Sequence, residues 1–352
     1  MKPSRLAILA IVIAMLPSCG GASDAPVFNP VISMNAIISP SEPFSNYTTE
    51  YQAIFAGGAR GAQTAAPWSS LESSGLVYDL TMISNPYMGL NALAGYGFTS
   101  ILVNIPIVTI NARSMPADIA GLPFNDQSVK DRYRLLIDQV LPYLNSSVKY
   151  VSLGNEIDTY FSTHPSEWLQ YKELIEDART YIRSLKPNIK VGVTTTFDGA
   201  TFTQAANVAS LNANMDVIIL TYYPTSPSFL VRSPLTVDAD MAEMIAIAEN
   251  KQLVLQEWGY PSSGTLLSSE QMQADFITYT FSSWRLYGSE HIPFISFFKR
   301  RDWTPAYCTT LTGQGAGNNY YEFLCSLGLL NNNGTSKMAY SALTMELSFI
   351  GP

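Results

Sequence analysis

The segment Val-Lys-Tyr-Val-Ser-Leu-Gly-Asn-Glu, residues 148–156, contains the pattern on which the fold prediction rests. It is a short, mostly apolar run that ends in polar residues, as expected for a strand buried on both faces of a parallel sheet. Before it, Asp126 can cap a helix whose apolar positions recur at helical spacing as far as Leu144. After it, Pro165 begins a second helix, which Pro187 ends. A strand between two amphipathic helices indicates an α/β protein with a parallel sheet.

The same alternation extends in both directions along the chain. The expected strands are residues 31–38, 61–66, 100–105, 148–153, 190–195, 216–221, 252–256 and 293–298. The expected helices lie near residues 46–58, 82–95, 126–144, 165–185, 201–210, 237–250, 268–284 and 336–348, and the seventh begins with a capping box formed by Ser268 and Gln271. This pattern predicts a single-domain (β/α)8 TIM barrel, with an open doubly wound sheet as the alternative fold.

The N-terminus has the pattern of an export signal. Lys2 and Arg5 precede an unbroken apolar run at residues 6–16, which is too short to span a bilayer as a helix. A small residue and a lone cysteine, Ser18-Cys19, follow the run and resemble a bacterial lipoprotein processing site. Ordinary signal cleavage near Cys19 and an uncleaved anchor are the alternatives.

This leader sets the predicted domain organisation and location. We expect a signal peptide at residues 1–18 and a lipid-anchored tether at residues 19–40, with the first barrel strand beginning near residue 31. Residues 41–352 then form the barrel domain. We expect an exported bacterial lipoprotein at the outer membrane, the cell surface or the periplasm, which contacts the membrane only through its lipid anchor at Cys19.

Composition narrows the possible partners. The formal net charge of −8 argues against binding to nucleic acid or anionic lipid. With 47% hydrophobic and 14% charged residues, the chain can bury the large core of one barrel, and we expect a monomer. Beyond Cys19, the remaining pair Cys308 and Cys325 is expected to form a disulfide in an oxidising compartment, the alternative being two free buried thiols.

Two carboxylates end predicted strands. Glu156 follows the run at 148–153 directly after Asn155, and Glu257 follows the run at 252–256. In TIM barrels, the chemistry takes place at the C-terminal ends of the strands. A charged group at the end of a buried strand usually has a partner or a task. We therefore place both glutamates at the mouth of the barrel, and pairing with arginines is the alternative to a catalytic role.

The residues around these glutamates resemble the two catalytic motifs of clan A glycoside hydrolases, which are retaining TIM-barrel enzymes. Leu153-Gly154-Asn155-Glu156 resembles the first motif. Gln256-Glu257-Trp258-Gly259-Tyr260-Pro261-Ser262 is similar to the second, and to a segment of galactanases and β-1,3-glucanases. The resemblance covers roughly residues 40–350 and implies that Glu156 is the acid/base and Glu257 the nucleophile. It also implies a β-linked polysaccharide or oligosaccharide as substrate.

The chemistry of retaining hydrolysis explains why two carboxyl groups are needed. They lie about 5–5.5 Å apart on either side of the glycosidic bond, where one protonates the leaving oxygen and the other attacks the anomeric carbon. One carboxyl must stay protonated beside an ionised one, so their pKa values must differ.

Several other residues are candidates for binding the sugar. Asn155 is expected to hydrogen-bond the 2-hydroxyl group, a role that the resemblance also implies. Of the two tyrosines that end the strand at 216–221, we favour Tyr222 over Tyr223 as the group that hydrogen-bonds the nucleophile. Asn104, which follows the strand at 100–105, is expected to bind a hydroxyl group.

Aromatic rings stack on the apolar faces of sugars. The candidates are Trp68 after the second strand, Trp258 beside the predicted nucleophile, and Trp303 after the eighth strand. Their location near predicted strand ends distinguishes them from the tryptophans at helical core spacing.

The sequence lacks the motifs that are typical of several other enzyme classes. The chain has only His164 and His291, in no metal-ligand spacing, so we predict no metal site. It contains neither a Gly-x-Ser-x-Gly nucleophile elbow nor a dinucleotide-binding fingerprint, so we expect no cofactor. The functional alternative is a non-catalytic surface lipoprotein that binds glycan through a glycosidase-like barrel.

Overall fold

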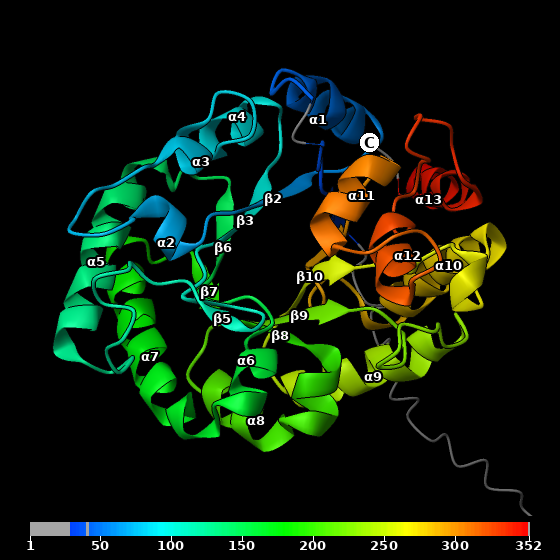
Figure 1. The fold of residues 1–352 in the computed structure, drawn as a ribbon. Helices are drawn as coiled ribbons and strands as arrows, with labels where there is room; N and C mark the ends of the chain where they lie inside the picture. The colour runs from blue at the N-terminus through cyan, green and yellow to red at the C-terminus, as the bar shows by residue number, and fades with distance from the viewer. Residues whose placement is uncertain (1–28, 40–41, 351–352) are drawn as a thin grey trace, which may run out of the picture.

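The computed structural model describes residues 29–39 and 42–350 and shows a parallel β-barrel surrounded by helices (Figure 1). The sheet has the strand order β7-β6-β3-β2-β1-β11-β10-β9-β8, and all its pairings are parallel. The strands are β1 Val31–Met34, β2 Gly61–Ala65, β3 Ser100–Asn104, β6 Val148–Ser152, β7 Lys190–Gly192, β8 Thr194–Thr196, β9 Ile218–Tyr222, β10 Leu253–Trp258 and β11 Phe294–Phe297. The predicted TIM barrel is confirmed.

The two strands at the ends of this order, β7 and β8, are halves of one barrel strand. They are separated only by Val193, and β7 pairs with β6 while β8 pairs with β9. Counting β7 and β8 as one, the sheet forms a closed barrel of eight strands. They lie at the eight predicted positions. Closure leaves the sheet without an open edge, which excludes the doubly wound alternative.

Helices cover the outside of the barrel, and shorter helices lie in its loops (Figure 1). The helices that follow the predicted pattern are α1 Asn46–Ala56, α5 Gln127–Val140, α7 Trp168–Leu185, α8 Ala205–Asn212, α9 Thr236–Ala248, α10 Glu270–Tyr287 and α13 Met338–Ser348. The shorter ones are α2 Trp68–Leu71, α3 Thr81–Ser84, α4 Leu90–Gly95, α6 Ile157–Thr163, α11 Pro305–Thr312 and α12 Asn319–Cys325. Within residues 29–39 and 42–350, no helix is both long and apolar enough to cross a bilayer.

Two details of the helix prediction are wrong. The helix expected over residues 82–95 is divided into α3 and α4, because Pro86 lies between them and lacks the amide that a continuous helix needs. The cap of α10 is Ser269, whose hydroxyl accepts the Met272 amide, and not Ser268. The predicted cap at Asp126 is confirmed, since its carboxylate accepts the amide of Ser128.

The inside of the barrel is filled in layers, and the upper layer is polar. At the lower level, Leu102, Tyr150, Val217, Ile219, Val254 and Phe294 form one apolar cluster. Above it, the buried hydroxyl groups of Ser152 and Thr194 are hydrogen-bonded at 2.7 Å, and Ser296 donates to Ser33 at 3.2 Å. The apolar layer supports the polar layer, which in turn lies beneath the mouth of the barrel.

The loops at the mouth carry additional structure. A small antiparallel hairpin, β4 Val108–Thr109 and β5 Ala112–Arg113, follows β3. Helices α11 and α12 follow β11 and are joined by the predicted disulfide between Cys308 and Cys325, whose Cα atoms lie 6.0 Å apart. Cys19 and the predicted signal peptide lie outside the described residues.

Replacing both Cys308 and Cys325 by alanine is expected to destabilise the protein by about 3 kcal/mol, the chain-entropy value for a loop of this length. Urea unfolding of the variant and of the wild type, with and without reductant, measures this loss. Reductant should lower the stability of the wild type and leave the variant unchanged. Equal unfolding midpoints for the oxidised wild type and the variant would contradict this expectation.

Candidate active site

A β-bulge in β10 positions the predicted nucleophile. In the pairing of β10 with β9, Leu255 is opposite Leu220 and Glu257 is opposite Thr221, so Gln256 is an extra residue on β10. Side chains normally alternate between the two faces of a strand, and a bulge re-aims them. As a result, both Gln256 and Glu257 face the interior of the barrel, where they line a cavity at its mouth.

Glu156 lies where β6 turns into α6. Its backbone has the left-handed conformation, with φ at 50°, which is uncommon for a residue other than glycine. The turn comes close to the helices behind it, because a Cβ atom on Gly154 would lie 2.4 Å from Ile157 and 2.5 Å from the Tyr171 hydroxyl. Glycine in the Leu-Gly-Asn-Glu motif thus lets the strand end pack closely enough to aim Glu156 into the mouth of the barrel.

Thr221 connects the two glutamates. Its hydroxyl group donates to Oε1 of Glu156 at 2.7 Å, and its backbone is the β-ladder partner of Glu257 on the neighbouring strand. Neighbouring strands lie about 4.8 Å apart. Both carboxylates also line the same cavity, so they lie near each other at the mouth of the barrel although they are far apart in sequence.

The surroundings of the glutamates change their pKa values. Burial, followed by repulsion from Glu257, raises the pKa of Glu156 to about 8. Burial also raises the pKa of Glu257, but hydrogen bonds from Tyr223 and Gln256 oppose this shift. The environment therefore favours a protonated Glu156 next to a Glu257 whose ionised form receives hydrogen bonds.

The tyrosine that contacts the predicted nucleophile is Tyr223, and the prediction of Tyr222 is wrong. Tyr223 donates from its hydroxyl group to Oε2 of Glu257 at 2.7 Å. Tyr222 is only 1% exposed, lies on the outer face of β9 and donates to Asp240. Side chains alternate between the two faces of β9. Thr221 faces inward, so the next inward position is Tyr223 and Tyr222 faces outward. A Cβ atom on Gly259 would lie 2.8 Å from the Tyr223 ring, so this glycine makes room for it.

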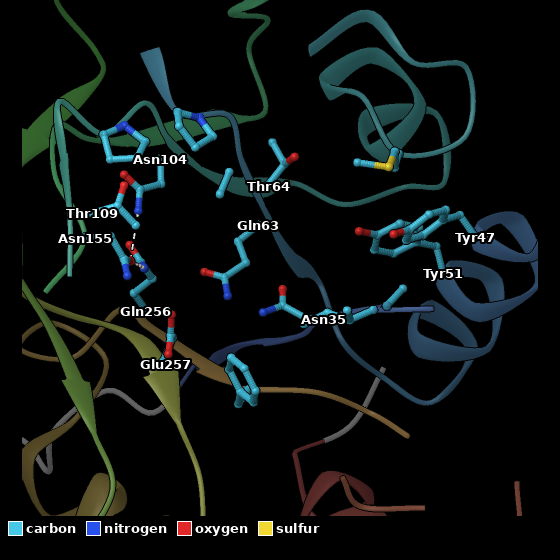
Figure 2. A pocket seen from close by; sticks show the side chains of 17 residues that line it. Asn35, Tyr47, Tyr51, Gln63, Thr64, Asn104, Thr109, Asn155, Gln256 and Glu257 are labelled. Carbon is cyan, nitrogen blue, oxygen red and sulfur yellow. Dashed lines mark hydrogen bonds between the residues drawn. The ribbon is translucent and has the colours of Figure 1, made fainter. Parts of the chain in front are cut away.

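Asn155 is held by a chain of hydrogen bonds. Its Oδ1 atom accepts from Nε2 of Gln256 at 2.6 Å and from Nδ2 of Asn104 at 3.1 Å (Figure 2). Gln256 in turn accepts the Thr194 hydroxyl, which is bonded to Ser152 in the layer below. Because both bonds end on its carbonyl oxygen, the orientation of the Asn155 amide is fixed, and its NH₂ group remains available to a ligand.

Two cavities meet at the glutamates and share Asn155, Glu257 and Phe298. The first, here called the amide cavity, has a volume of about 280 Å³. Its amide side chains are Asn35, Gln63, Asn104, Asn155 and Gln256, and Tyr47 and Tyr51 of α1 also line it. Figure 2 shows Asn35, which follows β1, and Gln63, which lies on β2, extending toward its centre. Among the described residues that line it, Glu257 is the only charged one.

The second, here called the aromatic cavity, has a volume of about 500 Å³ and contains Glu156. Its wall includes Phe197, Phe229, Trp303, Tyr320, Phe323 and Leu324, and the last four come from the segment that contains α11 and α12. Of the tryptophans predicted to contact sugar, only Trp303 lines either cavity. Lys299 lies beneath its ring, with Nζ 3.8 Å from the centroid.

The other two predicted tryptophans are core residues, and these predictions are wrong. Trp68 is 0% exposed, packs edge-on against Tyr133 and donates to Glu72. Trp258 is also 0% exposed and donates to Thr280 on α10, on the outer side of the sheet. The bulge explains why the Trp258 side chain faces outward, because Glu257 occupies the inward position and the next residue then faces the other side of the sheet.

Several lining residues were missed from the sequence. Asn35 and Gln63 belong to the least distinct strands, and the second motif includes Gln256 without indicating a role for it. Thr221 and Phe229 carry no motif. For Tyr223 and Thr221 a signal was present, namely the two-residue alternation of β9. Within the described part of the chain, no group of three or more His, Cys, Asp or Glu side chains is placed to hold a metal ion.

Comparison with known proteins gives one family match. The model for glycosyl hydrolase family 53 matches residues 126–280, which include both glutamates. No curated protein matches the sequence.

Solved structures share the fold at low sequence identity. An exo-β-1,4-mannosidase from Opitutaceae bacterium strain TAV5 superimposes with a TM-score of 0.69 at 14% identity, over 93% of this chain and 61% of that one. This chain thus spans less than two thirds of that mannosidase. A GH5_18 variant from Bifidobacterium longum subsp. longum, in complex with Manβ1-4GlcNAc, gives 0.71 at 13% identity, over 91% and 78%. GH5_18 from Streptomyces cattleya, in complex with GlcNAc, gives 0.70 at 14%, over 92% and 81%.

The family match and the shared barrel fold support a clan A glycoside hydrolase whose family is unassigned.

The Tyr222→Phe variant tests the corrected position of this residue. Removing its buried hydroxyl group takes a hydrogen bond from Asp240 and should destabilise the fold by about 1–3 kcal/mol. Urea unfolding measures the loss, with Tyr320→Phe as the control, because Tyr320 is 40% exposed. A similar loss in both variants would contradict the assignment.

Proposed function

We propose that this clan A glycosidase is a retaining enzyme that cleaves a β-linked oligosaccharide or polysaccharide by double displacement. The observation that supports this proposal is the arrangement around Thr221, which hydrogen-bonds Glu156 and is the strand partner of Glu257. It brings one carboxyl group with a raised pKa next to another that receives hydrogen bonds, as two-step displacement requires.

In the first step, the Glu156 carboxyl group donates its proton to the glycosidic oxygen while Glu257 attacks the anomeric carbon. The C–O bond to the leaving group breaks, and a glycosyl ester forms on Glu257. In the second step, Glu156 takes a proton from water, whose oxygen attacks the same carbon and releases Glu257. Tyr223 stabilises the carboxylate form of Glu257 whenever it is free.

In this mechanism, the two cavities bind the two parts of the substrate that the glycosidic bond joins. Glu257 and Asn155, which must contact the same sugar, line both cavities, whereas Glu156 lines the aromatic cavity and not the amide cavity. Glu156 lines the aromatic cavity, and the acid must contact the leaving oxygen. The amide cavity therefore holds the glycone, which is the sugar that becomes attached to Glu257. Its uncharged amides suit the hydroxyl groups of a neutral sugar.

The first substrates to test are β-mannosides, because two of the similar structures are named for β-1,4-mannosidase activity or contain Manβ1-4GlcNAc. Galactan, β-glucan and xylan complete the panel. For the location of the enzyme, we propose export as a lipoprotein anchored at Cys19, and metabolic labelling with a fatty acid tests this in wild type and Cys19→Ser.

The catalytic roles are tested with Glu257→Ala and Glu156→Ala, assayed on this panel and on aryl β-glycosides. Glu257→Ala should reduce reducing-sugar release to background. Glu156→Ala should lose roughly 10²–10⁴-fold on natural linkages and much less on a dinitrophenyl glycoside, whose leaving group needs no proton. The first product released should have the anomeric configuration of the substrate.

An unchanged rate for Glu257→Ala would remove Glu257 from the mechanism, and an inverted product would rule out double displacement. A wild-type protein that binds glycan but cuts no member of the panel would instead indicate a non-catalytic binding protein.

The pH dependence of kcat/KM tests the two pKa shifts. Activity needs Glu156 protonated, so it should fall as the pH rises above about 8. Activity also needs Glu257 ionised, and its raised pKa places the acidic limb above the usual range of a glutamate. Tyr223→Phe removes a hydrogen bond that lowers the pKa of Glu257, so it should move the acidic limb to higher pH. Tyr222→Phe is the matched control and should leave that limb in place.

A further inference from the structure

The aromatic cavity contains few hydrogen-bonding groups that are free to bind a sugar. The Thr221 and Tyr223 hydroxyls donate to the two glutamates, and the Thr196 hydroxyl donates to Asp158. Beyond Asn155 and the glutamates, the remaining polar side-chain groups of the wall belong to Asp198, Thr225, Tyr320 and Trp303, whose buried indole N–H has no hydrogen-bond partner. A second sugar would bring hydroxyl groups on every side, and each unpaired one would cost free energy when buried.

Aliphatic side chains line the same cavity. Ile110, Leu311 and Leu324 contribute to the wall beside the aromatic rings, and neither Ile110 nor Leu311 is needed to fill the core, since both are about two-fifths exposed. Sugar rings stack on flat aromatic faces, but branched aliphatic groups offer no such face. A wall of both kinds suits an apolar ligand.

Backbone strain is concentrated at this cavity. Among the described residues other than glycine, six have a positive φ, and three of these six line the aromatic cavity: Ile110 at 52°, Glu156 at 50° and Phe229 at 65°. A positive φ is a marked outlier for a β-branched or bulky residue. Such strain is characteristic of functional sites and persists only where the surroundings enforce it.

Ile110 is the clearest case, because it occupies the tight turn of the β4–β5 hairpin. That position favours asparagine, aspartate or glycine. Its side chain is 43% exposed, so burial in the core does not explain why isoleucine stands there. Its amide donates to the carbonyl oxygen of Asn155 at 2.7 Å, which places the turn beside the glutamates.

Phe229 is held on the opposite side by aromatic contacts. Its ring centroid lies 5.0 Å from that of Phe323 and 5.4 Å from that of Tyr320, both in the segment stabilised by the disulfide. Two loops and the α11–α12 segment therefore converge to present apolar groups to the side of the cleft that contains Glu156.

We propose that the aromatic cavity binds an apolar, ring-bearing aglycone, so that the substrate is a β-glycoside whose leaving group carries an aromatic or similarly apolar moiety. This inference rests on the proposed function for the assignment of the leaving-group side. Ile110 and Phe229 are specificity-determining residues for that group. Release leaves the aglycone with the proton from Glu156 and the glycone on Glu257.

Binding of 4-methylumbelliferone, a fluorescent aromatic aglycone that needs no cleavage, tests the site directly. Titration of the wild-type protein, followed by fluorescence anisotropy, should give saturable binding at one site that glucose and mannose do not displace. Ile110→Asn should weaken this binding by roughly tenfold, because it removes a contacting apolar side chain. Asparagine favours the left-handed backbone, so the variant should melt no lower than the wild type.

Leu76→Asn is the matched control. Leu76 also has a positive φ, at 65°, and is 47% exposed, but it lines neither cavity. This variant should bind 4-methylumbelliferone as tightly as the wild type. Equal binding by Ile110→Asn and the wild type, absence of saturable binding, or displacement by mannose would overturn the proposal.

A kinetic comparison separates this inference from the proposed function. On an aryl β-glycoside, Ile110→Asn should lower kcat/KM by roughly tenfold, and the loss on a disaccharide with the same glycone should be clearly smaller. Hydrolysis with equal losses on both substrates would overturn the aglycone site and leave the glycosidase function intact. If the wild type cleaves neither substrate, the proposed function fails, and the binding titration still decides whether the apolar site exists.

Discussion

The arrangement of the site depends on one irregularity, the β-bulge at Gln256. A regular strand would turn either Gln256 or Glu257 away from the barrel interior. With the extra residue, Gln256 anchors Asn155 from below while Glu257 faces the cavity. The Gln256 amide therefore links the polar layer inside the barrel to the groups that line the cavity. The same bulge turns Trp258 outward into the core.

The sequence predicted the eight strand positions, the two glutamates and the disulfide, because each depends on a local pattern. Apolar runs mark buried strands, a carboxylate after such a run marks the mouth of a barrel, and two remaining cysteines suggest a disulfide. The predictions for Tyr222, Trp68 and Trp258 were wrong. Whether these side chains reach the site depends on which face of the strand they occupy, or on the path of the loop. A bulge has no reliable signature in one sequence, so the orientation of Trp258 could not be predicted.

The barrel and its loops have different tasks in this molecule. Glu257, Thr221 and Gln256 lie within strands, and Asn155 and Glu156 lie a few residues beyond the end of β6, so ladder pairing and the packed layers below fix their geometry. The residues of the aromatic cavity come largely from loops, which tolerate change more readily. Here the disulfide and the contacts between Phe229 and Phe323 stiffen that loop wall, so it can hold a defined shape.

The amide cavity is polar and the aromatic cavity is apolar, and this contrast follows from the division between strand ends and loops. Strand ends are short and rigid, and they supply the amides of Asn35, Gln63 and Asn104, whose fixed positions suit the defined hydroxyl pattern of a sugar. An apolar moiety needs no directional partner, so shape and dryness suffice, and loops can provide both. Burial also bears on the proposed chemistry, since it raises the pKa of Glu156, the acid of the first step. In the proposed mechanism, the apolar wall thus both selects the leaving group and supports the acid that protonates it.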